Sequence, residues 1–378
     1  MDKAAHGTWT DHRKVLCVRL DTIGDVLMMG PALRALREQR PDRELTLLTS
    51  RAGALPAALM PELDRVIAHD APWMKTGAGS SAWRDCALVE RLRAAGFDAA
   101  AIFTSYSQSP LPAALTCHLA GIERVLAHCR ENPYALISDW VREPELELPT
   151  RHEVQRQLDL VATVGATSAE TGLALTVPPE ARANALRALR GAGIDPREPW
   201  LLLHPGATAS SRRYPPEHYV EALRQLTRET GRRVAISGSH AERADADAIA
   251  GELGGLAASL AGQLPFPELC GLVAAAPLLI CGNTGPAHIA AAVGTPSVVA
   301  YALTNPQHTP WQATGHVLTH DVPCRWCLSS VCREGHHGCL RGIPPLELAE
   351  AALDLLSRDT PAAIDGARPA VADRPAVA

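Results

Sequence analysis

A pair of carboxylates lies where an apolar run gives way to a helical pattern. Asp21 and Asp25 flank the turn residues Thr22 and Gly24, directly after a run that ends at residue 20. Asp caps helix starts well, so Asp25 is either an N-cap or a general base that projects into a cleft. The helix start favours the ionised carboxylate, which keeps Asp25 able to accept a proton but makes it a weak base.

A second loop combines a glycine with hydroxyl and guanidinium groups. It reads His-Pro-Gly-Ala-Thr-Ala-Ser-Ser-Arg-Arg-Tyr-Pro-Pro over residues 204–216 and includes Thr208, Ser211 and Arg212. Such groups between an expected strand and an expected helix are typical of a cradle for an oxyanion or a diphosphate. The alternative is a solvated loop with exposed arginines and a proline in the first helical turn.

A third loop reads Cys-Gly-Asn-Thr-Gly-Pro-Ala-His and lies in a stretch, residues 269–320, without Asp, Glu, Lys or Arg. Its candidate binding residues are Asn283, Thr284, Gly285, Pro286 and His288. Free N–H groups at a helix start, together with the helix dipole, favour a bound anion. The alternative is that Asn283 or Thr284 caps the helix and that His288 is a hydrogen-bonded core residue.

Glu242 lies in a fourth transition from loop to helix, Gly-Ser-His-Ala-Glu-Arg. Its carboxylate could contact a ribose hydroxyl, but a Glu in the first helical turn also stabilises the helix by itself. No Gly-x-Gly-x-x-Gly follows residue 20 or residue 204, and no P-loop sequence occurs anywhere. These absences argue against a nicotinamide-dependent dehydrogenase and against a P-loop nucleotidase.

Four cysteines lie within sixteen residues near the carboxyl end. They are Cys324, Cys327, Cys332 and Cys339. Four soft ligands at this spacing fit a tetrahedral, structural zinc site. A redox-labile thiol cluster and a partly disulfide-linked loop are the alternatives, and the spacing does not suggest the open position of a catalytic zinc.

The elements that position these loops alternate between short apolar runs and helical patterns, which predicts parallel sheets built from βα units. Expected strands span residues 15–20, 45–48, 65–68, 99–103, 200–204, 233–237, 278–281 and 297–300. Expected helices span residues 26–39, 83–95, 152–164, 216–229, 241–252, 266–275, 286–293 and 344–357. Ligands of such sheets bind at the carboxyl ends of the strands, where the four loops lie.

The length of 378 residues suggests two domains. We expect a flexible N-terminus over residues 1–14 and a first Rossmann-like domain over residues 15–170. A linker with two successive prolines would cover residues 171–180, and a second domain residues 181–357. The tail, residues 358–378, is rich in Pro and Ala and is expected to be disordered.

Composition points to a cytoplasmic globular protein. The chain is 47% hydrophobic and 20% charged with a net charge of −5, so it lacks the basic field of a nucleic-acid binder. The first 14 residues are polar and contain no signal-peptide core, and no apolar run reaches the roughly 18 residues of a membrane helix. The ten cysteines are then expected as reduced thiols or metal ligands.

Four blocks in order resemble glycosyltransferase family 9, the bacterial heptosyltransferases of lipopolysaccharide core assembly. The first three are VLCVRLDTIGDVLMMGPALRALR, LLLHPGATASSRRYPPEHY and GNTGPAHIAAAVGTPSV. The fourth, CRWCLSSVCREGHHGCL, is similar to a cysteine-rich segment of heptosyltransferase II-type members. The resemblance runs from about residue 15 to residue 356.

The resemblance implies an α/β fold of GT-B type, with two facing Rossmann-like, doubly wound domains, in which the last helix often crosses back to the first domain. It implies an inverting, metal-independent transfer of a heptose or related sugar from an ADP-sugar donor to a hydroxyl of a glycan or lipopolysaccharide-core acceptor. No cofactor is then required for catalysis. The implied location is the cytoplasm, with at most peripheral contact at the inner face of the membrane.

The resemblance also implies roles for single residues. Asp25 matches the catalytic base, and the loop with Asp21, Thr22 and Gly24 lies on the acceptor side. The positions that match the donor site are Thr208, Ser211, Arg212, Glu242, Asn283, Thr284, Gly285, Pro286 and His288. Within that set, Arg212 corresponds to a diphosphate contact and Glu242 to a nucleoside contact.

Asn283 departs from the family pattern, in which many members carry Asp at this position. Asn keeps the hydrogen bonding but removes the charge. The resemblance therefore leaves open whether the donor sugar is the usual heptose. Two alternatives to a transferase therefore remain at the level of the sequence. One is a nucleotide-sugar epimerase of the same architecture, and the other is a nucleotide-sugar-binding protein without turnover.

Overall fold

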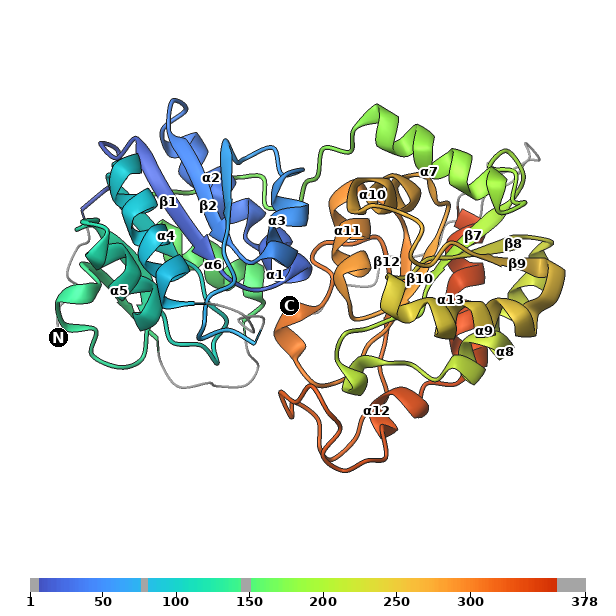
Figure 1. The fold of residues 1–378 in the computed structure, drawn as a ribbon. Helices are drawn as coiled ribbons and strands as arrows, with labels where there is room; N and C mark the ends of the chain where they lie inside the picture. The colour runs from blue at the N-terminus through green and yellow to red at the C-terminus, as the bar shows by residue number, and fades with distance from the viewer. Residues whose placement is uncertain (1–6, 76–80, 144–150, 359–378) are drawn as a thin grey trace, which may run out of the picture.

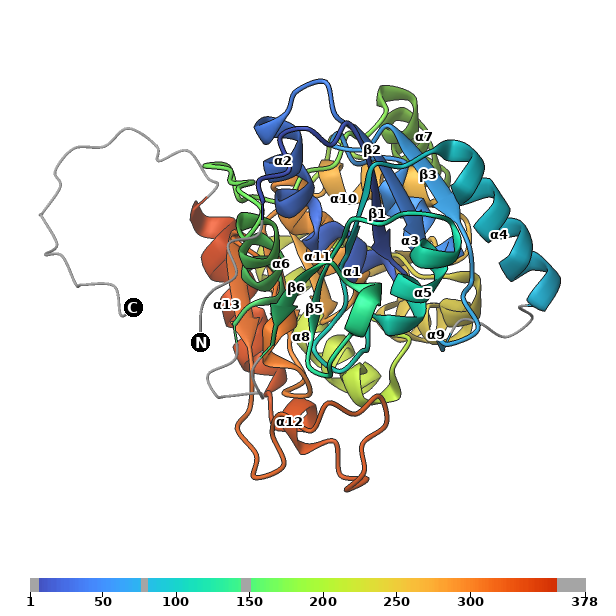
Figure 2. The same ribbon diagram turned by 90° about the vertical axis from the view of Figure 1, so that its left-hand side faces the viewer.

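The protein consists of two α/β units that lie side by side (Figures 1 and 2). The structure is a computed structural model that describes residues 7–75, 81–143 and 151–358. Each unit is a parallel six-stranded sheet with helices on both faces. The predicted fold class, two doubly wound Rossmann-like domains, is confirmed.

The first sheet has the strand order β3-β2-β1-β4-β5-β6. Its strands are β1 (Lys14–Arg19), β2 (Glu44–Thr49), β3 (Arg65–Ala68), β4 (Ala99–Ile102), β5 (Val125–Cys129) and β6 (Asp139–Arg142). The order reverses between β1 and β4, both of which are buried. The carboxyl end of β1 is therefore a topological switch point, the usual place for a ligand in such sheets.

The helices of the first unit are α1 (Ile23–Met28), α2 (Gly30–Gln39), α3 (Arg51–Ala57), α4 (Ala82–Ala95), α5 (Leu111–Leu119) and α6 (Glu153–Ala162). The sequence predicted one helix over residues 26–39, and this prediction is wrong. Pro31 lies at the second position of α2. Its ring has no N–H and clashes with the carbonyl four residues earlier, which favours the break between α1 and α2.

The second sheet has the order β12-β11-β10-β7-β8-β9. Its strands are β7 (Trp200–His204), β8 (Arg233–Ile236), β9 (Ala257–Ser259), β10 (Leu279–Gly282), β11 (Ser297–Ala300) and β12 (Gly315–Leu318). Its switch point lies between β7 and β10, and both strands are buried. The loops that follow these two strands are the second and third candidate loops of the sequence, so the topology brings them together.

The helices of the second unit are α7 (Pro179–Gly191), α8 (Pro216–Thr230), α9 (Arg243–Leu253), α10 (Phe266–Ala275), α11 (Gly285–Val293), α12 (Gly338–Arg341) and α13 (Pro345–Arg358). Short 3₁₀ turns are η1 (Tyr134–Leu136) in the first unit and η2 (Ser210–Arg212), η3 (His240–Glu242), η4 (Gly254–Leu256) and η5 (Pro306–His308) in the second. None of the described helices is both long enough and apolar enough to cross a membrane.

The last helix packs within the second unit, which corrects the expectation that it returns to the first. α13 lies against α8 and the β11–β12 edge (Figure 1). Its buried residues Leu348, Ala352 and Leu355 belong to the apolar core of the second unit. This amphipathic face is already covered there, so no apolar stripe is left for the first unit.

The start of the chain also differs from the expectation of a flexible segment. Trp9 is fully buried, and its backbone N–H donates to the Val164 carbonyl at 3.1 Å. Arg43, also fully buried, donates to the Trp9 carbonyl. Residues 7–13 are therefore anchored beside α2 and α6, because a buried indole contributes a large apolar area. Residues 1–6 and the expected disordered tail after residue 358 lie outside the described residues.

Candidate active site

Asp25 lies at the third position of α1, just after the switch point of the first sheet. The helix cap is Thr22, so the N-cap interpretation of Asp25 is wrong. Its Oδ2 instead accepts hydrogen bonds from the Thr22 backbone N at 3.4 Å and from Thr22 Oγ1 at 3.3 Å. This capping-box contact fixes the side chain and leaves Oδ1 directed elsewhere.

The second oxygen of Asp25 belongs to a buried charge cluster. Arg19, at the end of β1, is completely buried and forms ion pairs with three carboxylates. The distances are 2.8 Å to Asp21 Oδ2, 3.3 Å to Asp25 Oδ1 and 2.8 Å to Glu153 Oε1. His308 Nδ1 lies 3.7 Å from Asp25 Oδ1. A fifth of the Asp25 side chain remains exposed (20%), so a substrate can reach it.

The cluster separates the proton affinities of its two aspartates. Burial alone would raise the pKa of Asp25, but Arg19, together with His308 and His288, outweighs it and holds that pKa below its usual value. Burial, reinforced by the charge of Asp25, raises the pKa of Asp21 to about 6. Asp25 is therefore ionised at neutral pH and able to accept a proton, and Asp21, with its pKa of about 6, is mostly ionised there as well.

The N-terminus of α11 is open toward a ligand. Its N-cap residue is Thr284, one of the two candidates from the sequence, but the Thr284 side chain makes no capping hydrogen bond. Three buried polar atoms at this end have no hydrogen-bond partner among the described residues: Thr284 Oγ1, His288 Nδ1 and Arg212 Nε. Buried polar groups are nearly always satisfied, so this set indicates water or a polar ligand at the helix start.

Two glycines let α1 and α11 approach each other where the units meet (Figure 1). A Cβ on Gly24 would lie 2.7 Å from His288 Cδ2, and one on Gly285 would lie 3.0 Å from Ile23 Cγ2. The turn that carries Asp25 thus faces the open end of α11. The structure brings together a carboxylate from the first unit and a helix start from the second.

Asn283 and His288 are buried beside this helix start, where Pro286 occupies its first turn. Asn283 Oδ1 accepts a hydrogen bond from the Ala302 N at 3.4 Å. Burial lowers the pKa of His288 to about 3, so its ring is neutral at physiological pH. A Cβ added to Gly282 would lie 3.2 Å from the Arg212 carbonyl, so the loops that follow β7 and β10 are in contact.

The residues of the loop after β7 differ in exposure and in their contacts. Thr208 is exposed at the loop, whereas Arg212 is partly buried. Ser211 is buried, and its hydroxyl donates to the Ser329 carbonyl at 2.7 Å while its backbone N donates to the Ser330 carbonyl at 3.2 Å. The structure therefore uses Ser211 to hold the cysteine-rich segment against the loop.

Glu242 lies at the end of η3, where its carboxylate accepts a hydrogen bond from the Ser239 N at 2.7 Å. Burial would raise its pKa, but the Ser239 contacts and His204 lower it. A Cβ added to Gly206 would overlap the Glu242 carboxylate at 2.1 Å, so a larger residue there would displace the Glu242 side chain. A hollow of about 240 Å³ opens beside this pair, and Arg341 of the cysteine-rich region also lines it.

The four cysteines of the predicted zinc site are partly buried free thiols. Burial and the three other thiols raise the pKa of Cys339, so the four lie near one another. The donor set thus fits zinc in type and number. Within the described ranges, however, no three His, Cys, Asp or Glu side chains are placed to hold a metal ion. The zinc site stays a prediction.

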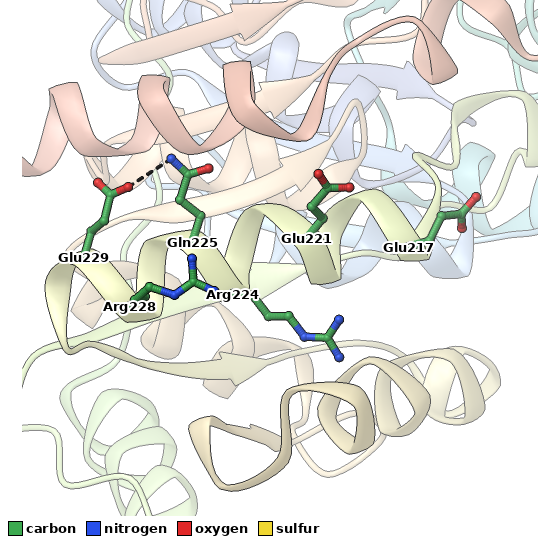
Figure 3. A pocket seen from close by; sticks show the side chains of 6 residues that line it. All are labelled: Glu217, Glu221, Arg224, Gln225, Arg228 and Glu229. Carbon is green, nitrogen blue, oxygen red and sulfur yellow. Dashed lines mark hydrogen bonds between the residues drawn. The ribbon is translucent and has the colours of Figure 1, made fainter.

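A shallow hollow on the outer face of α8 offers no comparable chemistry (Figure 3). Its lining residues are Glu217, Glu221, Arg224, Gln225, Arg228 and Glu229. Several are paired: Gln225 donates to Glu229 at 3.0 Å, and Arg224 contacts Glu252 at 2.9 Å. These are exposed surface charges of both signs and not a binding site.

Sequence reasoning missed three members of the charge cluster: Arg19, Glu153 and His308. Arg19 had a signal, because an arginine inside an apolar strand must find a buried partner. Glu153 and His308 had none, since each lies at the edge of a loop far along the chain from Asp25.

With this geometry described, comparison with known proteins identifies the family. A sequence profile of glycosyltransferase family 9 (heptosyltransferase) matches residues 86–337, more than half of the chain. The chain belongs to glycosyltransferase family 9. The predicted family and the predicted enzyme class, a glycosyltransferase, are confirmed.

Curated family 9 proteins match at moderate identity. The chain is 26% identical to lipopolysaccharide heptosyltransferase 1 of Pseudomonas aeruginosa, over 84% of this chain and 87% of that protein. It spans less than half of the length of the curated type 2 heptosyltransferases that it matches. These matches therefore do not distinguish strongly between the heptosyltransferase types.

Solved family 9 structures share the fold. A family 9 glycosyltransferase from Veillonella parvula superposes with a TM-score of 0.80 at 20% identity, over 94% of this chain and 100% of that one. The ADP-heptose lipopolysaccharide heptosyltransferase II of Escherichia coli superposes with a TM-score of 0.72 at 22% identity, over 92% of this chain and 99% of that one. At these identities the likeness establishes the arrangement of the two units.

Proposed function

We propose that this protein is an inverting, metal-independent transferase that moves a heptose or related sugar from an ADP-sugar to a hydroxyl of a lipopolysaccharide core or related glycan. One observation carries the proposal: Asp25 faces an uncapped helix start whose buried polar atoms lack partners. A base opposite an anion site is what transfer from a nucleoside diphosphate requires.

The donor side supplies positive potential. Arg212, the Thr208 hydroxyl and the N–H groups that follow Gly285 would stabilise the departing diphosphate, with little charge elsewhere in the loop after β10. Glu242 would contact the ribose. An ADP-sugar is favoured by the likeness to an enzyme described as an ADP-heptose heptosyltransferase.

The acceptor side offers an uncharged, partly apolar hollow of about 280 Å³ at the carboxyl end of the first sheet. Trp73 and Phe103 line it together with Ser107 and Gln108, and no charged residue among those described does so. Gln108 Nε2 donates to Asp21 Oδ1 at 2.5 Å, which joins the hollow to the charge cluster. Aromatic faces with a few polar groups suit a sugar ring.

Transfer then proceeds by a single displacement. The acceptor oxygen attacks the anomeric carbon from the face opposite the diphosphate, its proton passes to Asp25, and the bond to the phosphate oxygen breaks with its electron pair. A weak base suffices if the sugar already resembles an oxocarbenium ion when the proton moves. Contact between α1 and α11 excludes water and so limits hydrolysis of the donor.

The location follows from the acceptor. A lipopolysaccharide core is built on a membrane-bound lipid, so the enzyme would work in the cytoplasm at the inner face of the membrane through peripheral contact. No nucleic-acid partner is proposed, since the net charge of −5 offers no basic field.

Incubation with a panel of nucleotide-sugars, with and without a truncated lipopolysaccharide acceptor, tests the proposal. We expect release of ADP from ADP-heptose that depends on the acceptor, inversion at the anomeric carbon, and no effect of removing Mg²⁺. Conversion of the donor without acceptor would instead indicate an epimerase. Tight binding without transfer to any acceptor would indicate a binding protein.

Asn283 bears on donor selectivity in the same assay. An Asn283→Asp variant restores the charge that many members carry, beside the same Ala302 N–H. We expect the ranking of donor sugars to change if this side chain contacts the sugar ring. An unchanged ranking would show that Asn283 has only a structural role, in which it joins the loops after β10 and β11.

A further inference from the structure

His308 is the group of the second unit that lies nearest to the proposed base. It ends η5, and its Nδ1 lies 3.7 Å from Asp25 Oδ1 while its Nε2 lies 3.9 Å from Glu153 Oε2. Only 16% of the His308 side chain is exposed. One imidazole thus stands between two carboxylates that come from different helices, α1 and α6.

The loop that carries His308 is fixed to the first unit and to the segment between the units. His152, the N-cap of α6, contacts the Thr309 carbonyl through Nε2 at 2.8 Å. Trp311 Nε1 donates to the Thr171 carbonyl at 2.7 Å, and the Trp311 ring packs on the His152 ring at 4.6 Å. The position of His308 is therefore set by several contacts independent of any ligand.

The surroundings of His308 combine burial with charges of both signs. The titratable and charged groups that face it are Asp25, Glu153, Arg19, Arg212, His288 and His152. Burial lowers the pKa of His308 despite the opposing effect of Asp25 and Glu153. The ring is then neutral at rest, and a proton on Nε2 would point to Glu153 and leave the Nδ1 lone pair toward Asp25.

We propose that His308 is a positioning residue that takes over the acceptor's proton from Asp25. The acceptor O–H bond breaks as its oxygen bonds to the anomeric carbon, and the proton passes to Asp25 and then to Nδ1 of His308. Glu153 stabilises the resulting imidazolium through Nε2–H. The proton leaves to solvent after the products dissociate. This inference rests on the proposed function.

This proton relay from Asp25 to His308 suits two features of the charge cluster. Asp25 is a weak base because of its lowered pKa, so a second acceptor keeps the proton from returning to the product. The two carboxylates that flank the ring, Asp25 and Glu153, favour the positive charge on His308 when the proton arrives. Because His308 and Asp25 belong to different units, the relay is complete only when the units are in contact.

A His308→Gln variant removes the proton acceptor while keeping a polar side chain of similar reach. We expect kcat to fall about 10- to 100-fold, with KM for donor and acceptor within threefold of the wild-type values. His316→Gln is the matched control, since His316 contacts Asp354 at 2.7 Å on β12. A kcat of His308→Gln within twofold of the wild-type value would overturn the proposal.

Chemical rescue separates a proton-transfer role from a purely structural one. In a His308→Gly variant, added imidazole should restore kcat at least tenfold, and the rescue should increase with pH as the neutral imidazole fraction grows. A KM that rises together with the loss of kcat, without rescue, would show that His308 only supports the loop.

Ring-nitrogen NMR of histidine-labelled enzyme tests the same relay without any substrate. We expect His308 to be neutral at pH 7 with its proton on Nε2, and to titrate below the ordinary value of about 6.5. Asp25→Asn should lower that pKa further, because Asp25 raises it. An imidazolium or a proton on Nδ1 at pH 7 would overturn the relay, whereas absent transfer with the expected spectrum would contradict the proposed function alone.

Discussion

At the scale of the residue, Asp25 combines two functions that usually fall to separate side chains. Oδ2 completes the capping box of α1, and Oδ1 faces Arg19 and His308. The cap holds the carboxylate in one orientation, so no rotamer entropy is lost when substrate arrives. Arg19, more than the contact to Thr22, holds the pKa of Asp25 below its usual value, which a late proton transfer tolerates.

Replacing Asp25 by Asn tests this division. Asn keeps an oxygen for Thr22 and therefore the helix start, but it cannot take a proton. We expect kcat to fall by about 10²- to 10⁴-fold while ADP affinity, measured calorimetrically, stays within a factor of two. Asp42→Asn, at an exposed site, is the control. Turnover retained in Asp25→Asn would reject the base assignment.

His128 predicts how stability depends on pH. Burial lowers its folded-state pKa to about 4, whereas an unfolded histidine titrates near 6.5. Below pH 6.5 the unfolded chain therefore binds a proton that the folded chain does not, and stability falls as the pH drops toward 4. The loss between pH 7 and pH 5 is about 2 kcal/mol from this side chain.

Urea unfolding of wild type and His128→Asn at both pH values measures the effect. Asn can replace the contact to the Arg156 carbonyl without titrating. We expect the variant to lose about 2 kcal/mol less between pH 7 and pH 5 than the wild type does. Equal losses in both proteins would show that His128 is already accessible to protons in the folded state.

At the scale of the element, the sequence predicted most of the buried strands and the strongly periodic helices, but it missed the buried strand β5 and several short or unusual elements. β3, β7, β11 and α10 have the predicted bounds. α7 was missed because its two leading prolines resemble a linker, although proline in the first turn is a favoured helix start. β9 and β12 were missed because edge strands of three or four residues carry little apolar pattern.

The candidate site, like the fold, was predictable from the sequence only where it depends on neighbouring residues. Asp25 and the start of α11 follow from local order: strand, turn, helix. Glu153 was not predictable, because it meets Arg19 from 134 residues away through α6. His308 depends on how two separate units pack, which no local pattern encodes. Ser211 was expected at the donor, yet its hydroxyl holds Ser329.

The cysteine-rich segment gives an element-scale prediction about metal. We expect purified enzyme to contain about one zinc per chain, and cobalt-substituted enzyme to show thiolate charge-transfer absorbance. Cys327→Ser should lose the metal and lower Tm, because structural zinc contributes folding energy. Since Ser211 binds the Ser329 carbonyl, the donor KM should rise as well.

Cys86→Ser controls for the general effect of losing a thiol, because Cys86 is an exposed cysteine of α4. It should keep both the metal and Tm. Metal-free enzyme that is as stable as the zinc-loaded form would contradict the prediction. A disulfide found by mass spectrometry among the four cysteines would favour the oxidised alternative.

At the scale of the whole molecule, the two units meet through a continuous apolar core. Val26 and Leu27 of α1 belong to the same buried cluster as Ala287 and Ile289 of α11. Beside it, the charge cluster joins Asp25 to His308 across the boundary. The proposed catalytic groups are thus held by the packing between the units, and we expect a small change at that boundary to act on catalysis before it acts on stability.

Gly24→Ala is the sharpest test of that coupling. The new Cβ would lie 2.7 Å from His288 Cδ2, so α11 must move away from α1. Alanine favours the helix by up to about 1 kcal/mol relative to glycine, so Tm should not fall much. We expect kcat/KM to decrease about 10- to 100-fold, because displacement of reacting groups by about 1 Å is costly. Gly255→Ala, with open space around it, should leave kcat/KM unchanged. A Gly24→Ala enzyme with wild-type kcat/KM would show that the contact between α1 and α11 does not set the catalytic geometry.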